Sequence, residues 1–451
     1  MIRILDAADA QSLRAAGVAP ASVAPAVAAI IADVRARGDA AVRELTARFD
    51  GPTLDDPFLD EQSWDALAAA CPLEVRAALE LAAARVRAFH APQIPPSYQQ
   101  RLDAGGTVRC LTLPLERAAC YVPGGRAAYP STVIMTAAVA RLAGVPDVIV
   151  ATPPRRDGSI LPEVAAAARI AGATRILRAG GAQAVAALAI GTQRIPRVDV
   201  IVGPGNAYVT EAKKQLAGEV RIDSLAGPTE VVIVADGSAD PALVAVDLIA
   251  QAEHDPLALA LLITPDAALA RAVVAALGRE TIGAVALEAL QARGAAIVTR
   301  TLDEALALAN QLAPEHLELL LEDAAAAVAK VPRAAAVFVG PHAPVPVGDY
   351  LAGPNHTLPT SGTARFASPL GAADFVRRQN VIDYSAAQLA QDGPAIAALA
   401  HAEGLHAHAR AVEVRATGAS PPEPATGGAT RRDAEKAPSP TTVRSGTRRR
   451  E

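Results

Sequence analysis

Short apolar runs alternate with helical stretches through the middle of the chain, and this alternation limits the possible folds more than any other feature. It is clearest in a series of predicted strands and helices at 148–150 (strand), 162–171 (helix), 176–177 (strand), 182–190 (helix) and 198–202 (strand). Strands that alternate with helices are typical of a parallel sheet, because each helix carries the chain back to the start of the next strand.

A second series has the same pattern, with Ala-rich helices between apolar runs at 231–234, 260–263, 296–298, 317–320 and 336–339. The chain has 451 residues, too many for one ordinary hydrophobic core. The predicted fold class is therefore α/β, with two incomplete, Rossmann-like, parallel-sheet domains.

Helical patterns precede and follow these two series. Ala, Leu, Arg and Glu recur at helical spacing over 23–90, and helices are expected again at 386–390 and 396–415. From 416 to 451 the sequence is mostly Pro, Gly, Ser, Thr, Ala and charged residues, with too little apolar surface to offset the entropy of ordering. We expect this tail to be disordered.

Composition excludes several classes of protein. Hydrophobic residues make up 51% of the chain, yet no stretch supplies the roughly 18 strongly apolar residues that a membrane span needs, and the start does not resemble a secretory signal. A net charge of −5 gives no basic field for nucleic acid. The three cysteines, Cys71, Cys110 and Cys120, have no CxxC spacing and so predict neither disulfides nor a thiolate zinc site. Cytoplasm is the expected compartment.

Three glycine-containing turns follow predicted strands, at Pro123-Gly124-Gly125, at Gly180-Gly181 and at Gly203-Pro204-Gly205-Asn206. Open α/β sheets bind ligands at the carboxyl ends of their strands, and the N–H groups at a helix start favour a phosphate. These turns could therefore bind a dinucleotide, although none of them is a GxGxxG and, taken alone, tight βα turns with no ligand are the simpler interpretation.

Polar residues that could bind a metal lie in the second half of the chain. Gln251 and His254 are three residues apart in a helical stretch, so both side chains lie on one face. Asp349 follows a Pro-rich loop, and His408 lies on the last helix. Two imidazoles with a carboxylate and an amide oxygen can hold Zn²⁺, and also Mn²⁺ or Co²⁺, although any one of these histidines alone is more simply an exposed or capped side chain.

Glu315 and His316 stand side by side at the start of the predicted strand 317–320. A histidine here can act as a general base near neutral pH, and an adjacent carboxylate can orient water. Neighbouring residues on a strand point to opposite faces, so the two side chains share a site only if the backbone is irregular, which Pro314 favours.

The short motifs together are more specific than any of them alone. In chain order they are YVPGG at 121–125, GPGNAYVTEAK at 203–213, AGPTE at 226–230, QAEH at 251–254, APEHL at 313–317, GDY at 348–350, GPNH at 353–356, and EGL at 403–405 with His408. In this order they resemble the histidinol dehydrogenase family, over nearly the whole chain to about Arg415.

The resemblance implies roles for individual residues. Zinc, one per subunit, would be held by Gln251, His254, Asp349 and His408, and acid–base chemistry would belong to Glu315 and His316. Substrate contacts would come from these ligands and His316, with Thr229, Glu403 and His356 added. NAD would meet Tyr121, Gln183 and Asn206. The family pattern also implies a homodimer with shared active sites, each receiving His408 from the other subunit.

The resemblance implies oxidation of L-histidinol through the aldehyde to L-histidine, the last steps of histidine biosynthesis, with two NAD⁺ and one water. Some relatives carry a Glu where this chain has Val345, so a family member that oxidises another small alcohol, such as a sulfopropanediol, is the alternative. From the residues alone, a zinc hydrolase and a non-catalytic scaffold also remain open.

The expected division of the chain has five parts: an N-terminal arm 1–17; a first α/β domain 18–120 plus 229–369 with the zinc and acid–base residues; a second α/β domain 121–228 on the cofactor side; a C-terminal helical segment 370–415 that reaches the partner subunit; and the tail 416–451.

Overall fold

The computed structural model describes residues 2–6, 23–124 and 129–416. It contains two parallel sheets, as predicted, and these belong to one compact unit formed by 1–97 and 111–379. A second, smaller unit comprises 98–110 and 380–451. The expected disordered tail lies outside the described residues except for Ala416, which ends the last helix.

The first sheet, sheet A, has six parallel strands in the order β1-β11-β10-β9-β12-β13. Their bounds are β1 Arg3–Asp6, β9 Glu230–Ala235, β10 Leu259–Thr264, β11 Ala295–Val298, β12 His316–Leu320 and β13 Ala336–Val339. All five strands predicted in the second series are confirmed. Part of the predicted N-terminal arm is instead an edge strand of this sheet, because β1 pairs with β11.

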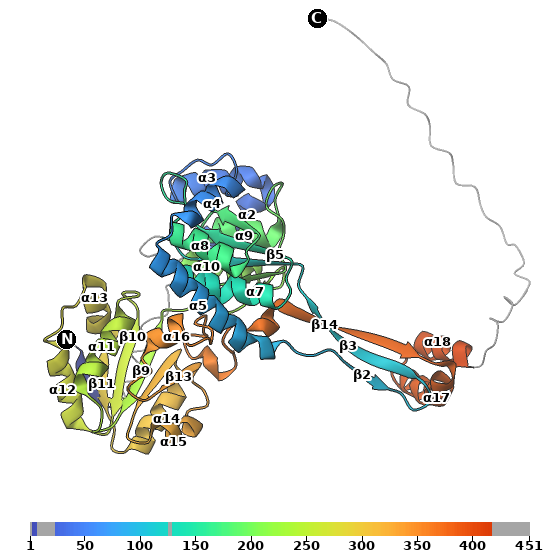
Figure 1. Ribbon diagram of the computed structural model, residues 1–451. Coiled ribbons are helices and arrows are strands. Elements are labelled where there is room, and N and C mark those ends of the chain that lie inside the picture. Colours follow the sequence, from blue (N-terminus) through green and yellow to red (C-terminus); the bar gives the residue numbers. More distant parts are fainter. Residues whose placement is uncertain (1, 7–22, 125–128, 417–451) are drawn as a thin grey trace, which may run out of the picture. The chain divides into compact units, whose positions relative to one another are not determined.

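Helices cover both faces of sheet A because its strands are apolar on both sides. Val231 and Ile233 pack with one group of helices, whereas Val232 and Val234 pack with the other. The first group is α11 Pro241–Ala252, α12 Ala267–Leu277 and α13 Ala284–Arg293, and the second is α14 Leu302–Leu312 and α15 Ala324–Ala327 (Figure 1). A short helix, α16 Val345–Tyr350, follows β13.

The second sheet, sheet B, has five parallel strands in the order β6-β5-β4-β7-β8. Their bounds are β4 Arg117–Tyr121, β5 Asp147–Thr152, β6 Arg175–Arg178, β7 Val200–Val202 and β8 Arg221–Ile222. One core contains α4 Glu61–Ala69, α5 Leu73–His90, α8 Pro162–Ala171 and the helical stretch 130–142, which is made of α6 Pro130–Val133, a π-helix Ile134–Ala138 and α7 Val139–Leu142. The other contains α2 Ala24–Arg37, α3 Asp39–Phe49, α9 Gly181–Ile190 and α10 Ala207–Leu216.

This packing corrects one predicted boundary. The expected division assigned 18–120 to the same domain as 229–369, but the helices of 24–90 bury their apolar faces against sheet B. Helical periodicity shows that such a helix has an apolar face without showing which sheet that face covers. Trp64 illustrates the contact, since it is fully buried and its indole N–H donates to the Ala165 carbonyl of α8 at 2.9 Å.

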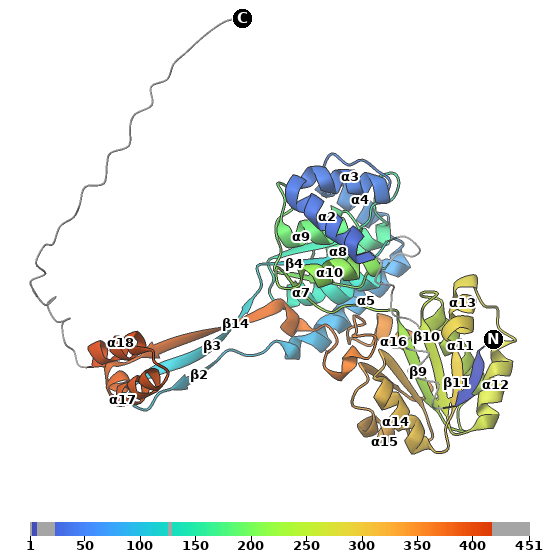
Figure 2. The ribbon, with the colours of Figure 1, turned by 180° about the vertical axis from the view of Figure 1, so that it is seen from behind.

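The second unit contains an antiparallel hairpin and two helices (Figure 2). The hairpin joins β2 Tyr98–Arg101 to the first part of β3 Gly106–Pro114, and α17 Ala386–Ala402 packs on α18 His406–Ala416. Gln388 fixes α17 to the hairpin turn, because its side-chain oxygen accepts from the Ala104 N–H at 2.7 Å.

The predicted helical segment 370–415 is therefore partly wrong, since β14 Val376–Tyr384 lies within it beside β3. The predicted helix 396–415 is also divided, because Gly404 adopts φ +72° between α17 and α18. In the described parts of the chain, none of the helices is long and apolar enough to span a bilayer.

Candidate active site and cofactor pocket

Polar side chains gather at the amino ends of two neighbouring strands of sheet A. Thr229 precedes β9, Glu315 precedes β12, and His316 begins β12 in register with Val231. The chain enters β12 irregularly, because Ala313 adopts φ +46° and Pro314 follows it. This irregular entry lets Glu315 and His316 share one site, with Glu315 Oε2 3.7 Å from His316 Nδ1.

Glu315 is buried and receives two hydrogen bonds on one oxygen. The Thr229 hydroxyl donates to Oε2 at 2.6 Å, and the Glu230 N–H donates to the same atom at 2.8 Å. Burial nevertheless raises the pKa of Glu315 to about 8, because loss of hydration outweighs both donors, and the Asp349 carboxylate adds to the rise. A carboxylate with a raised pKa is a stronger base than an exposed one.

Gln251 joins this group from the last turn of α11. Its side-chain N–H donates to the Thr229 hydroxyl at 2.5 Å, which fixes the amide so that Oε1 is the free end. Oε1 is buried and has no hydrogen-bond partner among the described residues. A buried, unpartnered amide oxygen is suited to a cation, because leaving it unpaired costs free energy.

The backbone of β9 holds the His316 ring in place. Its Nδ1 lies 3.1 Å from the Glu230 carbonyl, so Nδ1 carries the proton and Nε2 has a lone pair. Nε2 is buried without a hydrogen-bond partner in the described residues and lies 3.9 Å from Asp349 Oδ1. Burial lowers the pKa of His316, which keeps the imidazole neutral and able to accept a proton.

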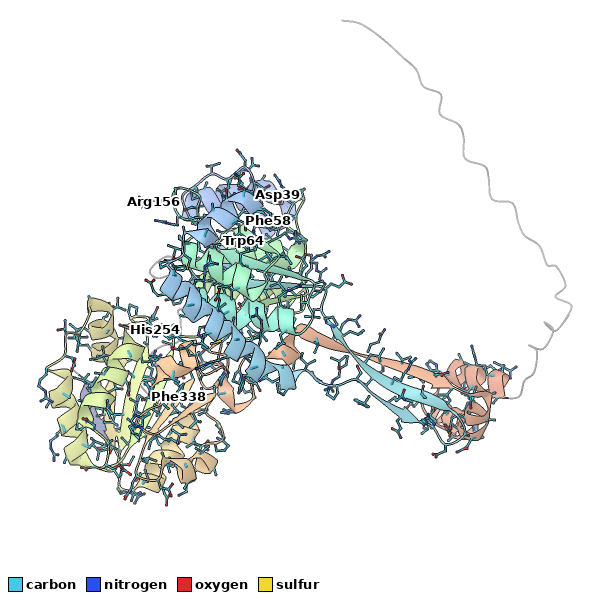
Figure 3. All side chains as sticks on the ribbon, in the orientation of Figure 1. Asp39, Phe58, Trp64, Arg156, His254 and Phe338 are labelled. Carbon is cyan, nitrogen blue, oxygen red and sulfur yellow. The ribbon has the colours of Figure 1, made fainter. Side chains whose placement is uncertain are left out.

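Asp349 comes from α16, which lies close to β13. A Cβ on Gly348 would come within 2.7 Å of the Phe338 ring, so glycine permits this approach. Burial raises the pKa of Asp349, whereas the imidazoles of His316 and His254 oppose the rise. Figure 3 marks His254, just beyond α11, and Phe338 on β13.

His356 is partly buried and contacts two segments of the larger unit. Its Nδ1 donates to the Asp349 backbone carbonyl at 2.9 Å, and its Nε2 lies 3.3 Å from the Thr132 hydroxyl of α6. Burial lowers the pKa of His356 to about 4, so the ring stays neutral. In this structure His356 therefore anchors the segment that carries Asp349.

The predicted zinc ligands fall in both units. Gln251, His254 and Asp349 belong to the larger unit, whereas His408, in the first turn of α18, is an exposed residue of the smaller one. The predicted substrate residue Glu403 is also exposed in the smaller unit, at the C-cap of α17. No three His, Cys, Asp or Glu side chains of the described ranges form a group that could hold a metal by themselves. The predicted set differs from such a group because it includes an amide oxygen and a residue from the second unit.

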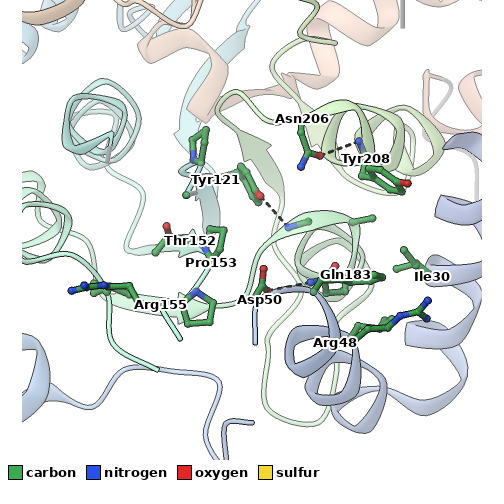
Figure 4. Close-up of a pocket in the computed structure, with 18 of the residues that line it drawn as sticks. Ile30, Arg48, Asp50, Tyr121, Thr152, Pro153, Arg155, Gln183, Asn206 and Tyr208 are labelled. Atoms are coloured by element: carbon green, nitrogen blue, oxygen red, sulfur yellow. Dashed lines mark hydrogen bonds between the residues drawn. The ribbon is translucent and has the colours of Figure 1, made fainter. Parts of the chain in front are cut away.

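The predicted cofactor residues Tyr121, Gln183 and Asn206 border a single cavity of about 1340 Å³ (Figure 4). It lies where β4 and β5 end and α9 and α10 begin, as expected for an open parallel sheet. Gly125 lies outside the described residues. Gly124, by contrast, borders the cavity beside Pro153.

The start of α9 is already capped by side chains. The Gly181 N–H donates to the Tyr121 hydroxyl at 3.0 Å, and Asp50 accepts from the Gly180 N–H at 3.3 Å and from Gln183 Nε2 at 3.4 Å. Asp50 lies just after α3, in the helical lead-in, and sequence reasoning missed it because no motif surrounds it. Arg48 and Arg155 also border the cavity and supply positive charge.

Val345, where the chain departs from some relatives, is buried with the apolar residues that pack under α11 and α12. Its backbone N–H donates to Glu318 Oε1 at 3.0 Å. The valine thus contributes to the core of sheet A.

Comparison with known proteins agrees with these features. The histidinol dehydrogenase family model matches residues 14–416. Histidinol dehydrogenase of Synechococcus sp. is 50% identical over 86% of this chain and 90% of its own length, and that of Gluconobacter oxydans is 49% identical over 89% and 95%. The crystal structure of histidinol dehydrogenase from Elizabethkingia anophelis superposes with a TM-score of 0.82 at 33% identity, covering 88% of this chain and 92% of that one. The chain belongs to the histidinol dehydrogenase family.

Proposed function

We propose that this chain oxidises L-histidinol through L-histidinaldehyde to L-histidine, with two NAD⁺ and one water, as the last steps of histidine biosynthesis in the cytoplasm. Family membership favours this oxidoreductase chemistry over a hydrolase or a scaffold. The observation that carries the proposal is the unpartnered Nε2 of His316, which faces Asp349 while Glu315 lies 3.7 Å from the same ring.

A zinc ion fits the side chains present. Gln251 Oε1, His254 and Asp349 would bind it from one subunit, and His408 would complete the set from a second copy in a homodimer with shared active sites. The orphaned Gln251 oxygen supports this assignment, because it is buried and otherwise unpaired in the described structure. When bound, the ion would supply a positive template for the nitrogen atoms of the substrate.

His316 would act in both oxidations. Its Nε2 takes the proton of the substrate hydroxyl while the hydride leaves the adjacent carbon for the nicotinamide, and this converts the alcohol to the aldehyde. Water must then add to the aldehyde carbon, because the second hydride can leave only from the hydrate. Glu315 removes a proton from this water as its oxygen bonds to the aldehyde carbon, and the His316 imidazolium returns its proton to the aldehyde oxygen, which gives the hydrate and a neutral imidazole. His316 Nε2 then accepts a hydroxyl proton of the hydrate as the second hydride leaves for a second nicotinamide.

The remaining proposed contacts place substrate and cofactor. Glu403 would contact the substrate, Tyr121, Gln183 and Asn206 would contact NAD, and the Thr229 hydroxyl would hold Glu315 and Gln251 in place beside the substrate.

The test is the stoichiometry of NADH formed from limiting L-histidinol by metal-replete protein. We expect two NADH per histidinol, abolished by a chelator and restored by zinc. A sulfopropanediol in the same assay tests the alternative substrate, and turnover with it but not with histidinol would overturn the proposal.

Two variants test the roles of the two catalytic side chains. Glu315→Gln should form the first NADH and slow the second step, so that aldehyde accumulates, whereas His316→Ala should lose both steps and retain zinc. His342→Ala is the matched control, because His342 is exposed and lies outside the site. Equal rates of both steps in Glu315→Gln would contradict the role of this carboxylate.

A further inference from the structure

A buried ion pair holds the turn 203–206, whose last residue, Asn206, borders the cofactor cavity. The Lys213 ammonium on α10 donates to Asp223 Oδ1 at 2.6 Å, and the two side chains are 3% and 5% exposed. None of the proposed steps uses either residue.

Both members of the pair hold the same residue, Gly203. Lys213 Nζ donates to the Gly203 carbonyl at 2.7 Å, and the Gly203 N–H donates to Asp223 Oδ2 at 2.7 Å. Asp223 also accepts from the Ser224 N–H at 2.7 Å. Charged side chains from other elements therefore fix both backbone groups of Gly203, its N–H and its carbonyl.

The turn needs such fixing because it lies directly against β4. Gly203 adopts φ +107°, and a Cβ there would lie 2.1 Å from the Tyr121 carbonyl oxygen. Tyr121 in turn caps α9 through its hydroxyl. Three residues after Gly203, Asn206 is the N-cap of α10, and its side-chain oxygen accepts from two backbone N–H groups of the first turn. A shift at Gly203 would thus move Tyr121 or Asn206, which both border the cavity.

Stability alone does not explain a buried charge pair here. Removing two charges from water is expensive, and an apolar pair of similar volume often stabilises a fold equally well. A lysine and an aspartate do what apolar side chains cannot, because they donate to and accept from the backbone of the turn.

We propose that Lys213 and Asp223 are positioning residues that hold the Gly203 turn in the conformation that binds the dinucleotide. The inference rests on the proposed function, since it concerns the NAD site of that enzyme. The pair acts through Gly203 and Asn206 rather than by touching the cofactor.

The test uses three single variants and one double variant. Lys213→Met removes the donor to Gly203 and leaves the Asp223 charge buried, whereas Lys213→Met with Asp223→Asn leaves a neutral pair. Lys213→Arg keeps the charge and donors, and Lys214→Met is the matched surface control, because Lys214 is the exposed neighbour. NADH binding, the KM for NAD⁺ and for histidinol, kcat, zinc content and Tm are measured for each.

We expect the double variant to regain the Tm lost by Lys213→Met and still to bind dinucleotide about tenfold more weakly, the effect of a modest loss of order at the turn. Its KM for histidinol and its zinc content should stay unchanged, and Lys213→Arg should recover part of the dinucleotide affinity.

A double variant with wild-type KM for NAD⁺ and wild-type NADH affinity would overturn the inference. Parallel losses of zinc, histidinol binding and Tm would overturn it as well, since they indicate a general structural role. If the wild-type protein binds no dinucleotide, the proposed function itself fails.

Discussion

Glu318→Gln should change how the stability of the protein depends on pH. Glu318 lies on β12 and is 1% exposed, with Oε1 accepting from the Val345 N–H at 3.0 Å. Burial raises the pKa of Glu318 to about 8, and the nearby Asp247 carboxylate of α11 adds to the rise. Glutamine keeps the acceptor for Val345 and offers Asp247 an N–H donor, but it cannot lose a proton.

The direction of the pH dependence follows from comparing the folded and unfolded states of the protein. Because the pKa of Glu318 in the folded protein, about 8, exceeds the ordinary value of 4.5, the folded state keeps a proton that the unfolded state releases. This contribution to wild-type stability is fully present below pH 4.5 and is lost as the pH rises through about 8. The difference between the two pKa values corresponds to roughly 5 kcal/mol for a single independent group. Sharing of the proton with Asp247 makes this an upper value.

The assay is thermal unfolding of the wild type and of Glu318→Gln at pH 5 and pH 9. The wild type should lose up to roughly 10 °C more in Tm between these pH values than the variant does. Glu322→Gln is the control, because Glu322 is an exposed carboxylate two residues after β12 and should leave the wild-type pH dependence unchanged. Equal losses of Tm in the wild type and in Glu318→Gln would refute the reasoning.

Three further substitutions test the site and the turn. Thr229→Val removes one of two donors to Glu315, so kcat should fall about 10- to 100-fold in the NADH assay, whereas Thr229→Ser should keep most activity. Asn206→Ala removes the cap of α10 and should lower the free energy of unfolding by about 1 kcal/mol in denaturant titrations, and Asn206→Asp should retain it. Gly203→Ala should lower Tm sharply, because its Cβ would meet a backbone oxygen at 2.1 Å, whereas Gly283→Ala, with open space around the Cβ, should not.

The sequence was sufficient to predict eight strands of the two parallel sheets, β5 to β7 and β9 to β13, because their residues are apolar on both faces and helices separate them. The ranges of β1, β4 and β8 were not predicted. The sequence also did not predict β14, whose residues Arg377, Arg378, Gln379 and Asn380 are exposed and carry no apolar alternation. A strand of this kind is specified by pairing with β3, which is not visible in local sequence.

In the site, too, contacts between neighbouring residues could be predicted, whereas contacts between distant elements could not. Adjacent Glu315 and His316 could be predicted from their types and from Pro314, and the bent entry to β12 does bring them together. Asp50 and Asp223 could not be predicted, because their partners at Gly180 and Gly203 lie on other elements. Side chains that act by holding a distant backbone group have no spacing that a sequence pattern could reveal.

The pairing of β1 with β11 has a consequence for synthesis on the ribosome. Arg3 leaves the exit tunnel before sheet B, yet its partner Ala295 is made only after all of sheet B. Domains generally fold as they are completed, so we expect the helices and strands of 24–222 to reach their folded state before β1 can pair with β11. Closure of sheet A then joins the beginning of the chain to its later part, as a late and slow step of high contact order.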